Sequence, residues 1–474
     1  MRDRLVSMEL EPVDISKLAF TLPALDRDYM QRNFIAKLSS IFCVLATAIS
    51  LAAEQDSVRF TMATTAEAVA EITASAPGAS WETTGAEASV ADISVDGQYN
   101  QNLVLYRGAQ SSVFKVFLGP LAAGAHTIRV QRNAEWSAPN ASLNVESVKA
   151  SSAGAGAAEY AALVHAPILY ARADTIGHFS DVPMLMWYET SPSDGGTNLQ
   201  YSFIFSNEDG GTATDALMAR WGRTTDIEYV YRVQLDASGN VTHETFQGPD
   251  HQELPFHGKK LGQHPFLLNV SRNNNVIDIG YSAMQYRIYP VQADLSQHSR
   301  EELMDRFPWT YKIMAQELER EGKLRQFGTV AGTNVSDPRN YLYLELGGDV
   351  PATAGLAVWV KLTNRAELYS SDRGRLDYSI MRGGWARTTV ELPPGTTADQ
   401  IEYVAVQCVD LRDPRLPMQG PEPVAHLHAG GKAFLLNRDY QPGPALLAFT
   451  DVPQLRPERM VLVKPAKASP QTAP

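Results

Sequence analysis

The chain has 474 residues, 44% of them hydrophobic, and carries 53 acidic against 41 basic side chains, a formal net charge of −12. A negative surface repels phosphate backbones, so this charge argues against a nucleic-acid partner. The chain contains only two cysteines, Cys43 and Cys408, so we expect its stability to come from buried apolar surface rather than from disulfides.

The N-terminal part predicts export. Arg32 and Lys37 precede an uncharged run over 38–53 that ends in small residues. This is the layout of a secretory signal peptide, and a run of about 16 residues is short for a bilayer span of about 20. We therefore expect a signal peptide over 30–53, an additional N-terminal extension over 1–29, no stable membrane span after cleavage, and a secreted or periplasmic product. The alternative is a cytoplasmic extension before a membrane anchor.

Residues 56–150 predict a β-sandwich. The runs LVLY, VFKVFL and HTIRVQ are β-branched and aromatic and are separated by Gly and Pro turns, as is typical of small sandwiches. The phrase LGPLAAGAHTIRVQ resembles the penultimate hairpin of carbohydrate-binding-like sandwiches. Four aromatic residues could stack on sugar rings or pack in the core: Trp81, Tyr99, Tyr106 and Trp136.

Residues 160–325 predict a central β-rich domain, the candidate catalytic one. The segment WGRTTDIEYVYRVQL predicts a strand in which every second residue lies on the same face. One face then carries every second residue from Ile227 to Leu235, and the other face carries Asp226 and Glu228. Carboxylates at i and i+2 have Cα atoms about 6.5–7 Å apart. One can then act as acid and the other as base or nucleophile, as glycoside hydrolysis requires. We predict Asp226 and Glu228 as catalytic; the alternative is a solvent-facing sheet surface.

Four histidines follow in HETFQGPDHQELPFHGKKLGQHPF: His243, His251, His257 and His264. Histidine suits proton transfer near neutral pH, and its neutral ring is a common metal ligand. We predict His251 and His264 as proton-transfer partners of the carboxylates, with Asp250 and Glu253 as substrate contacts. The spacing matches no zinc pattern such as H-E-x-x-H. We therefore expect no metal cofactor, with calcium or zinc as the alternative.

Two polar loops could line the same pocket. The loop SNEDGGTATD offers oxygen ligands of the kind calcium favours, namely Asn207, Glu208, Asp209 and Asp215. The loop SRNNNVIDIG carries three consecutive asparagines, which indicate either a tight turn or recognition of sugar hydroxyls. We predict Asn274, together with Trp221 and Arg223, as substrate contacts.

The central segment ends in helices, and a second β-sandwich follows. Ser299 and Glu302 form a capping-box pattern, Pro308 fits the first turn of a second helix, and Gly322 ends it. Apolar runs alternate with turn clusters over 335–464, which predicts the second sandwich. Its loop ELYSSDRGRLDYS could bind an acidic or sugar ligand, or be a solvated loop without one.

Several of these segments also carry a resemblance. HAPILYARAD, SDVPMLMWYE, IFSNEDGG, WGRTTDIEYVYRV, GPDH and RNNNVIDIG together resemble a group of secreted bacterial β-rich proteins of unassigned function, over most of 56–325. The central segment is also similar to vacuolar-sorting-related β proteins, although the glycine and tryptophan of their second strand motif are missing here. Neither resemblance implies a mechanism.

The expected fold class is mainly β and multi-domain, with two β-sandwiches flanking a central β-rich domain that has a short C-terminal helical segment. We expect a secreted carbohydrate-active enzyme, a glycoside hydrolase or polysaccharide lyase. It would act on an extracellular polysaccharide or oligosaccharide by carboxylate and histidine acid–base chemistry. The alternative is a non-catalytic secreted carbohydrate-binding or cell-surface protein. A third reading, a metal-dependent hydrolase of other esters, needs the histidine cluster to converge.

Overall fold

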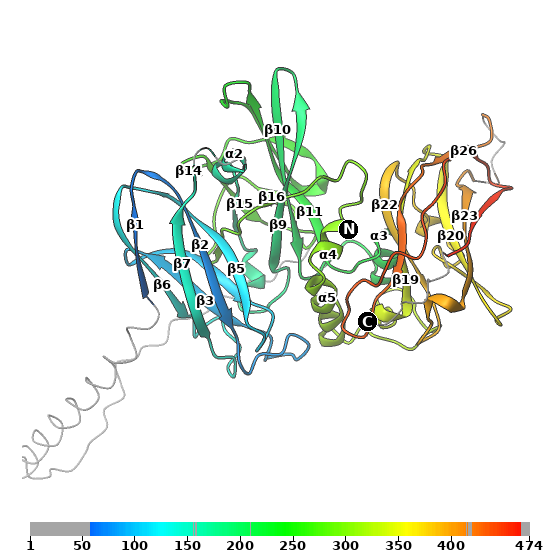
Figure 1. Cartoon of the computed structure of the whole chain (residues 1–474), viewed down its shortest axis with the longest axis horizontal. Coiled ribbons are helices and arrows are strands. Elements are labelled where there is room, and N and C mark those ends of the chain that lie inside the picture. The colour runs from blue at the N-terminus through cyan, green and yellow to red at the C-terminus, as the bar shows by residue number, and fades with distance from the viewer. Residues whose placement is uncertain are drawn as a thin grey trace, which may run out of the picture. The chain divides into compact units, whose positions relative to one another are not determined.

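Strands dominate the computed structural model, which describes residues 57–154, 156, 159–208, 210–413, 415 and 420–465. The predicted signal peptide and N-terminal extension lie outside these residues. The described part is mainly β and multi-domain, as the sequence predicts, with one sandwich on each side of a central β-rich region in chain order (Figure 1). Its residues belong to one compact unit, Ser57–Pro474, so the predicted domain boundaries stay predictions.

The N-terminal sandwich consists of two antiparallel sheets. One has the order β1 (Ser57–Met62), β6 (Gly124–Arg132), β3 (Ser89–Val95), β4 (Gln98–Leu105); the other has the order β5 (Ser112–Leu121), β2 (Ala66–Ser75), β7 (Asn144–Ser152). Trp81 and Tyr106, two of the candidate sugar-stacking aromatics, are 1% and 7% exposed and lie in the core. Tyr99 is 47% exposed.

The central region also contains two sheets. The six-stranded sheet has the order β13 (Glu253–Pro255), β12 (Val241–Gln247), β11 (Asp226–Asp236), β10 (Gly196–Phe205), β9 (Pro183–Ser193), β18 (Val291–Gln292). The second has the order β14 (Lys260–Leu261), β15 (His264–Asn269), β8 (Ile168–Tyr170), β17 (Gln285–Tyr286), and β16 (Val276–Ile277) pairs with β15. The helices α2 (Tyr160–Val164) and α3 (Thr214–Trp221) belong to the same stretch.

Strand β11 contains a bulge that the sequence pattern does not reveal. Tyr201 of β10 pairs with Tyr231, but the next residue, Ser202, pairs with Tyr229, so Val230 is an additional residue. A bulge of this kind reverses the alternation of faces. Ile227 therefore packs into one core cluster and Tyr231 into another. The predicted single face from Ile227 to Leu235 is wrong beyond the bulge.

The predicted helical segment forms two helices, α4 (Glu302–Arg306) and α5 (Trp309–Arg320). Pro308 directly precedes α5, and Gly322, with φ of 63°, lies just beyond its end. The predicted capping box is wrong, because the Ser299 hydroxyl donates to Glu345 Oε2 at 2.8 Å instead of capping α4. The capping side chain is therefore used in a tertiary contact.

The C-terminal sandwich has its own core cluster. One sheet has the order β22 (Gly384–Glu391), β19 (Tyr341–Asp349), β24 (Ala425–Leu427), β26 (Val452–Leu455), with β25 (Lys432–Leu435) also pairing with β19. The other has the order β21 (Leu368–Ser370), β20 (Ala354–Leu362), β23 (Ile401–Asp410), β27 (Met460–Val463). Short 3₁₀ helices lie at Ala173–Thr175, Pro249–His251, Pro338–Asn340, Leu376–Tyr378 and Ala398–Gln400.

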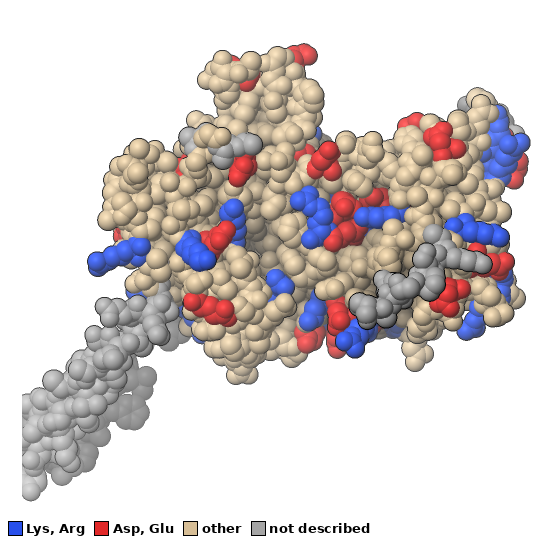
Figure 2. Space-filling model, viewed as in Figure 1, with Lys and Arg blue, Asp and Glu red and all other residues tan. Residues whose placement is uncertain are grey.

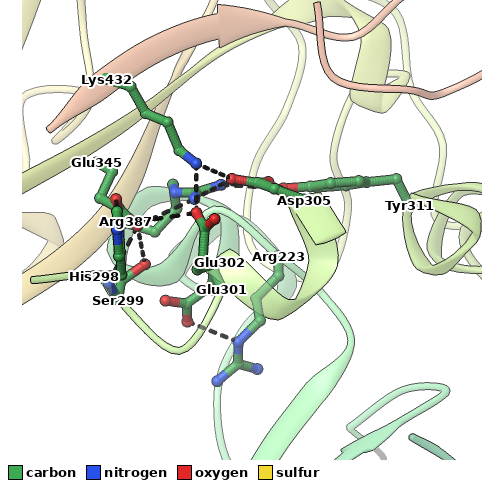
Figure 3. Close-up of polar contacts among 10 residues, drawn as sticks. All are labelled: Arg223, His298, Ser299, Glu301, Glu302, Asp305, Tyr311, Glu345, Arg387 and Lys432. Atoms are coloured by element: carbon green, nitrogen blue, oxygen red, sulfur yellow. Dashed lines mark hydrogen bonds and ion pairs between the residues drawn. The ribbon is translucent and has the colours of Figure 1, made fainter. Parts of the chain in front are cut away.

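A charge network joins α4 and α5 to the C-terminal sandwich (Figure 3). We use this name for His298, Ser299, Glu302, Asp305, Tyr311, Glu345, Arg387 and Lys432. Arg387 is fully buried and donates to Asp305 Oδ2 at 2.7 Å and to Glu345 Oε2 at 3.2 Å. Lys432 Nζ lies 2.7 Å from Asp305 Oδ2 and also bonds Glu302. Burial alone would raise the pKa of Asp305, but Arg387 and Lys432 outweigh it and lower that pKa.

Oppositely charged side chains also lie beside one another on the molecular surface, on the face that Figure 2 draws. Independently of that view, Arg232 and Glu253 form a surface ion pair, with Nη1 and Oε2 2.7 Å apart. Within the described residues, we find no helix with the length and apolar character needed to cross a membrane.

Candidate functional site

Polar residues from four separate sequence motifs meet at the start of β11. Asp226 and Glu228 come from this strand, Glu208 from the loop after β10, His251 from the turn after β12, and Asn274 from the loop after β15. Asp181, which the sequence did not single out, joins them from the segment before β9. We refer to these six residues as the carboxylate cluster.

Asn274 is the centre of the carboxylate cluster. It is fully buried, and its Nδ2 donates to Asp226 Oδ2 at 2.9 Å and to Asp181 Oδ1 at 3.3 Å. Its Oδ1 accepts a hydrogen bond of 2.6 Å from Asn269. The predicted tight turn of the asparagine run is present, since Asn274 has a φ of 51°. The turn directs the amide inward, toward two carboxylates, rather than toward a substrate in solvent.

Burial favours the protonated form of Asp226. It is 2% exposed, and burial, with the nearby charges of Glu228 and Glu208, raises its pKa to about 8. Arg223, whose Nη1 lies 3.8 Å from Asp226 Oδ1, and the Asn274 hydrogen bond oppose this rise only in part. A carboxyl group that stays protonated near pH 7 is what a general acid requires.

Glu228 connects this buried acid to the surface. Its Oε2 accepts a hydrogen bond from Gln247 and lies 3.7 Å from His251 Nδ1. The Glu228 contact raises the pKa of His251. The His251 side chain is 51% exposed, and its Nε2 lies 2.8 Å from Asn273 Nδ2. His251 is therefore the member of the carboxylate cluster that solvent reaches most readily.

The backbone around the cluster is strained. Among the described residues, nine other than glycine have a positive φ, and four of these lie in or beside the cluster: Asp181, Asp250, His251 and Asn274, with φ of 50°, 58°, 57° and 51°. Left-handed conformations cost L-residues about 1–2 kcal/mol, somewhat less for Asn and Asp. Such strain concentrates at functional sites, where the surrounding structure fixes it.

A hollow of ≈500 Å³ adjoins the cluster. Its lining includes Arg172, Asn269, Arg272 and Tyr281. Two of these side chains also contact the cluster, because Arg172 donates to Asp181 at 2.5 Å and Asn269 donates to Asn274. Tyr281 is 75% exposed. Small-molecule pockets have volumes of about 300–1,000 Å³, and the volume of this hollow lies within that range.

The structure does not bring His264, predicted as a second proton-transfer residue, to this cluster. His264 is fully buried, with Nδ1 2.7 Å from the Ala166 carbonyl oxygen and Nε2 3.1 Å from Glu67 Oε2. Its ring stacks on Phe117 with centroids 4.4 Å apart. Both ring nitrogens have protein partners, so His264 packs β15 against the N-terminal sandwich. His243 and His257 are exposed.

The predicted substrate contacts lie in different places. Arg223 is 3% exposed, and its Nε donates to Glu301 at 3.1 Å, so it is a buried ion-pair residue. Asp250 lies exposed beside His251. Glu253 is exposed on β13 and pairs with Arg232. Trp221 ends α3, where the guanidinium of Arg220 lies 4.3 Å from its ring centroid.

The predicted calcium loop does not converge on one point. Glu208 joins the carboxylate cluster, and burial raises its pKa. Asp215 instead accepts from the Tyr378 hydroxyl at 2.7 Å and from the Gly332 amide at 2.8 Å. Asp209 lies outside the described residues. In the polar loop of the C-terminal sandwich, Arg373 donates to the Val330 carbonyl oxygen and is a structural contact.

Two other groups in the described part bring potential metal ligands together: His298, Glu302 and Glu345, and Asp349, His426 and His428. The first group belongs to the charge network, where Arg387 and Lys432 already supply positive charge to its carboxylates. The second was missed from the sequence. The sequence feature that could have indicated this group is the pair His426 and His428. Residues two apart in a strand lie on the same face of the sheet.

The chain matches no protein-family model and no curated protein. Among solved structures, NLPPya in complex with mannosamine is similar over 29% of this chain and 73% of that chain, with a TM-score of 0.21 and 12% identity. NLPPya in complex with glucosamine covers the same shares, with a TM-score of 0.22 and 14% identity. The M60 catalytic domain with the CBM51-1 and CBM51-2 domains of ZmpB from Clostridium perfringens is similar over 71% of this chain and 30% of that chain, with a TM-score of 0.14 and 9% identity. At such TM-scores these similarities carry no conclusion about fold or function.

Proposed function

We propose that the chain is a secreted carbohydrate-active enzyme, a polysaccharide lyase or glycoside hydrolase, whose acid–base chemistry takes place at the carboxylate cluster. The observation that supports this most is that Glu228 raises the pKa of the buried Asp226 electrostatically and also contacts the exposed His251. Titratable groups whose pKa values are shifted by burial and by specific neighbours are typical of catalytic sites. The proposed export rests on the signal-like segment 30–53.

The exposed fractions of the cluster side chains favour a lyase over a glycoside hydrolase. Asp226 and Glu228 are 2% and 8% exposed, so His251 is the group that a polymer would reach. In a lyase, the His251 imidazole removes the proton from the carbon next to a uronate carboxylate. The electron pair left behind forms a carbon–carbon double bond, and the glycosidic oxygen leaves with a proton returned by the imidazolium. Arg272, exposed at the adjoining hollow, is suited to bind the uronate carboxylate.

The test is a screen of the purified chain against acidic and neutral polysaccharides. Unsaturated products, detected by ultraviolet absorbance, identify a lyase, whereas reducing ends without unsaturation identify a hydrolase. We expect His251→Ala and Glu228→Gln to lower kcat/KM by about 100-fold or more, the usual contribution of a general acid or base. His243→Ala, an exposed histidine on β12, is the matched control and should retain full activity. Activity that survives both cluster substitutions would refute this assignment.

A non-catalytic carbohydrate-binding protein is the second candidate, and one observation favours it. Tyr281 is 75% exposed at the rim of the hollow, with its ring 6.2 Å from that of Tyr170. Exposed aromatic faces stack on sugar rings. If no glycan is cleaved, binding that is lost in Tyr281→Ala and kept in His251→Ala would establish this function instead.

A further inference from the structure

Two histidines and two aspartates gather on the outer face of the C-terminal sandwich. His426 lies in β24 and His428 just beyond it, with Leu427 between them fully buried in the core. Asp349, the last residue of β19, pairs directly with His426 in the antiparallel register. Asp451 comes directly before β26, the next strand of the same sheet. Three neighbouring strands therefore hold these side chains on a rigid surface.

The distances among these side chains match those between ligand atoms of a single metal ion. Asp349 Oδ2 lies 3.3 Å from His426 Nδ1 and 3.2 Å from His428 Nε2. Charge-assisted hydrogen bonds are shorter, about 2.7–2.9 Å. In tetrahedral zinc sites, metal–ligand bonds of about 2.0–2.1 Å place two ligand atoms about 3.3–3.4 Å apart. The three ligand atoms all lie within 4.8 Å of one another.

Asp451 fixes the ring of His426 in the orientation that a metal ligand needs. His426 Nε2 lies 2.8 Å from Asp451 Oδ1, a hydrogen bond in which the ring N–H donates. In the neutral imidazole, Nδ1 then has no proton and directs a lone pair toward Asp349. A proton on Nδ1 or a metal ion between the two atoms satisfies this pair of acceptors. A carboxylate that holds the second ring nitrogen is the usual outer partner of a zinc-binding histidine.

We propose that Asp349, His426 and His428 bind a zinc ion, with Asp451 as the outer carboxylate. Two imidazoles and one carboxylate form a ligand set that zinc accepts, with a water molecule in the fourth position. Both histidines are about one-third exposed and Asp349 is 72% exposed, so ions reach the site from solvent. The bound ion would join β19 to β24 directly, and β26 through Asp451. This proposal does not depend on the chemistry of the carboxylate cluster.

Zinc titration of the full chain, free of any histidine tag, in competition with a chromophoric chelator tests the proposal. We expect one equivalent of Zn²⁺ to bind the wild type. His426→Ala and His428→Ala should each weaken binding at least tenfold, and Asp451→Asn by about 10–100-fold, the usual effect of losing an outer partner. His243→Ala, which removes an exposed histidine from another sheet, should bind as the wild type does.

Cobalt supplies a second measurement. Co²⁺ in the wild type should give the strong visible absorption of a tetrahedral site, and the absorption should be absent from a His426→Ala/His428→Ala double variant. Because these side chains are on the surface, the variants should keep the thermal unfolding profile of the metal-free wild type. Failure of the wild type to bind Zn²⁺, or unchanged affinity in the double variant, would overturn the proposal.

Discussion

The position of Asp226 in the fold determines the pKa of its carboxyl group. Its carboxyl group lies at the start of a buried strand, within reach of Asn274 and Arg223, yet burial and the charges of Glu228 and Glu208 dominate its pKa. The folded chain therefore keeps Asp226 neutral at a pH where an exposed aspartate is ionised. This neutral form is the one compatible with burial.

The raised pKa of Asp226 gives the stability a defined pH dependence. Between the ordinary value of 3.8 and the folded value of about 8, the folded chain binds more protons than the unfolded chain. The contribution of Asp226 to stability is thus fully present below its ordinary pKa and is lost as the pH rises through about 8. We expect Asp226→Asn to remove this loss, so its stability relative to the wild type should increase from acidic to alkaline pH. Urea unfolding at a series of pH values measures the difference.

Asp194→Asn is the control for this prediction, because Asp194 is exposed in the turn between β9 and β10. It should follow the wild-type profile. If Asp226→Asn also loses stability across the same interval as the wild type does, the raised pKa belongs to another group.

At the residue scale, the sequence predicted several residues of the carboxylate cluster but not which of them contact one another. Spacing selected Asp226 with Glu228, and local enrichment selected His251, because both signals are short in range. Asn274, however, bonds Asp226 and Asp181, which are 48 and 93 positions away in the chain. Asp181 has no neighbouring motif, and only the folded chain brings it beside Asn274.

At the scale of elements, the sequence predicted where strands and helices lie but not their irregularities. The alternation in β11 is regular in sequence, and the bulge at Val230 comes from its pairing with β10. In the same way, Ser299 and Glu302 have the capping-box spacing, but Glu345 takes the serine hydroxyl. Both errors have one cause, namely that a tertiary partner competes with the local pattern.

A buried hydrogen bond between Trp81 and Glu317 helps to join helix α5 to the N-terminal sandwich. Trp81 Nε1 donates to Glu317 Oε2 at 2.6 Å, and Arg320 pairs with the other carboxylate oxygen at 2.5 Å. Burial raises the pKa of Glu317 to about 7 even with these partners. Loss of the indole donor should therefore leave Glu317 with an unsatisfied buried oxygen.

We expect Trp81→Phe to lower the free energy of unfolding by about 2–4 kcal/mol, since it removes both a hydrogen bond to a buried acid and part of a filled core position. Chemical denaturation at neutral pH measures the loss. Trp136→Phe is the matched control, because Trp136 is only half-buried and lies at the edge of the same core cluster. Equal losses in the two variants would show that the indole of Trp81 contributes packing alone.

At the scale of the whole molecule, the three β-rich stretches were predictable, but their common core was not. The runs of β-branched and aromatic residues are local and indicate strands directly. The largest hydrophobic cluster, by contrast, extends from Met62 in β1 through Trp187 in β9 and Tyr311 in α5 to Phe434 in β25. In the sequence, each of these side chains looks like part of the core of its own segment. Their assembly depends on contacts between distant segments, which a pattern of period two does not encode.

The charge network links α4 and α5 to the C-terminal sandwich, and its contribution to stability can be tested. Arg387 is fully buried and neutralises Asp305 and Glu345, and it lowers the pKa of both carboxyl groups against the opposing effect of burial. Removing one partner of a buried ion pair leaves an uncompensated charge, which typically costs about 3–5 kcal/mol. We therefore expect Arg387→Met to lose about this much stability at neutral pH. The stability that comes from a lowered carboxyl pKa is fully present above the ordinary value and is lost as the pH falls through the lowered one, so the gap between variant and wild type should shrink as the pH falls below the ordinary values of 3.8 for Asp305 and 4.5 for Glu345.

Arg375→Met is the matched control, since Arg375 forms an ion pair with Asp377 in which both side chains are more than half exposed. Surface pairs of this kind contribute little, so its unfolding profile should equal that of the wild type. Denaturant unfolding at neutral and acidic pH, followed in all three proteins, separates the two cases. A loss in Arg387→Met that stays constant with pH would indicate lost packing against Phe434, whose ring lies 5.2 Å from the guanidinium, rather than unpaired carboxylates. A loss that follows the protonation of the carboxylates would mean that ion pairing holds the C-terminal sandwich to α4 and α5 in addition to the apolar contacts of Tyr311 with Tyr343 and Phe434.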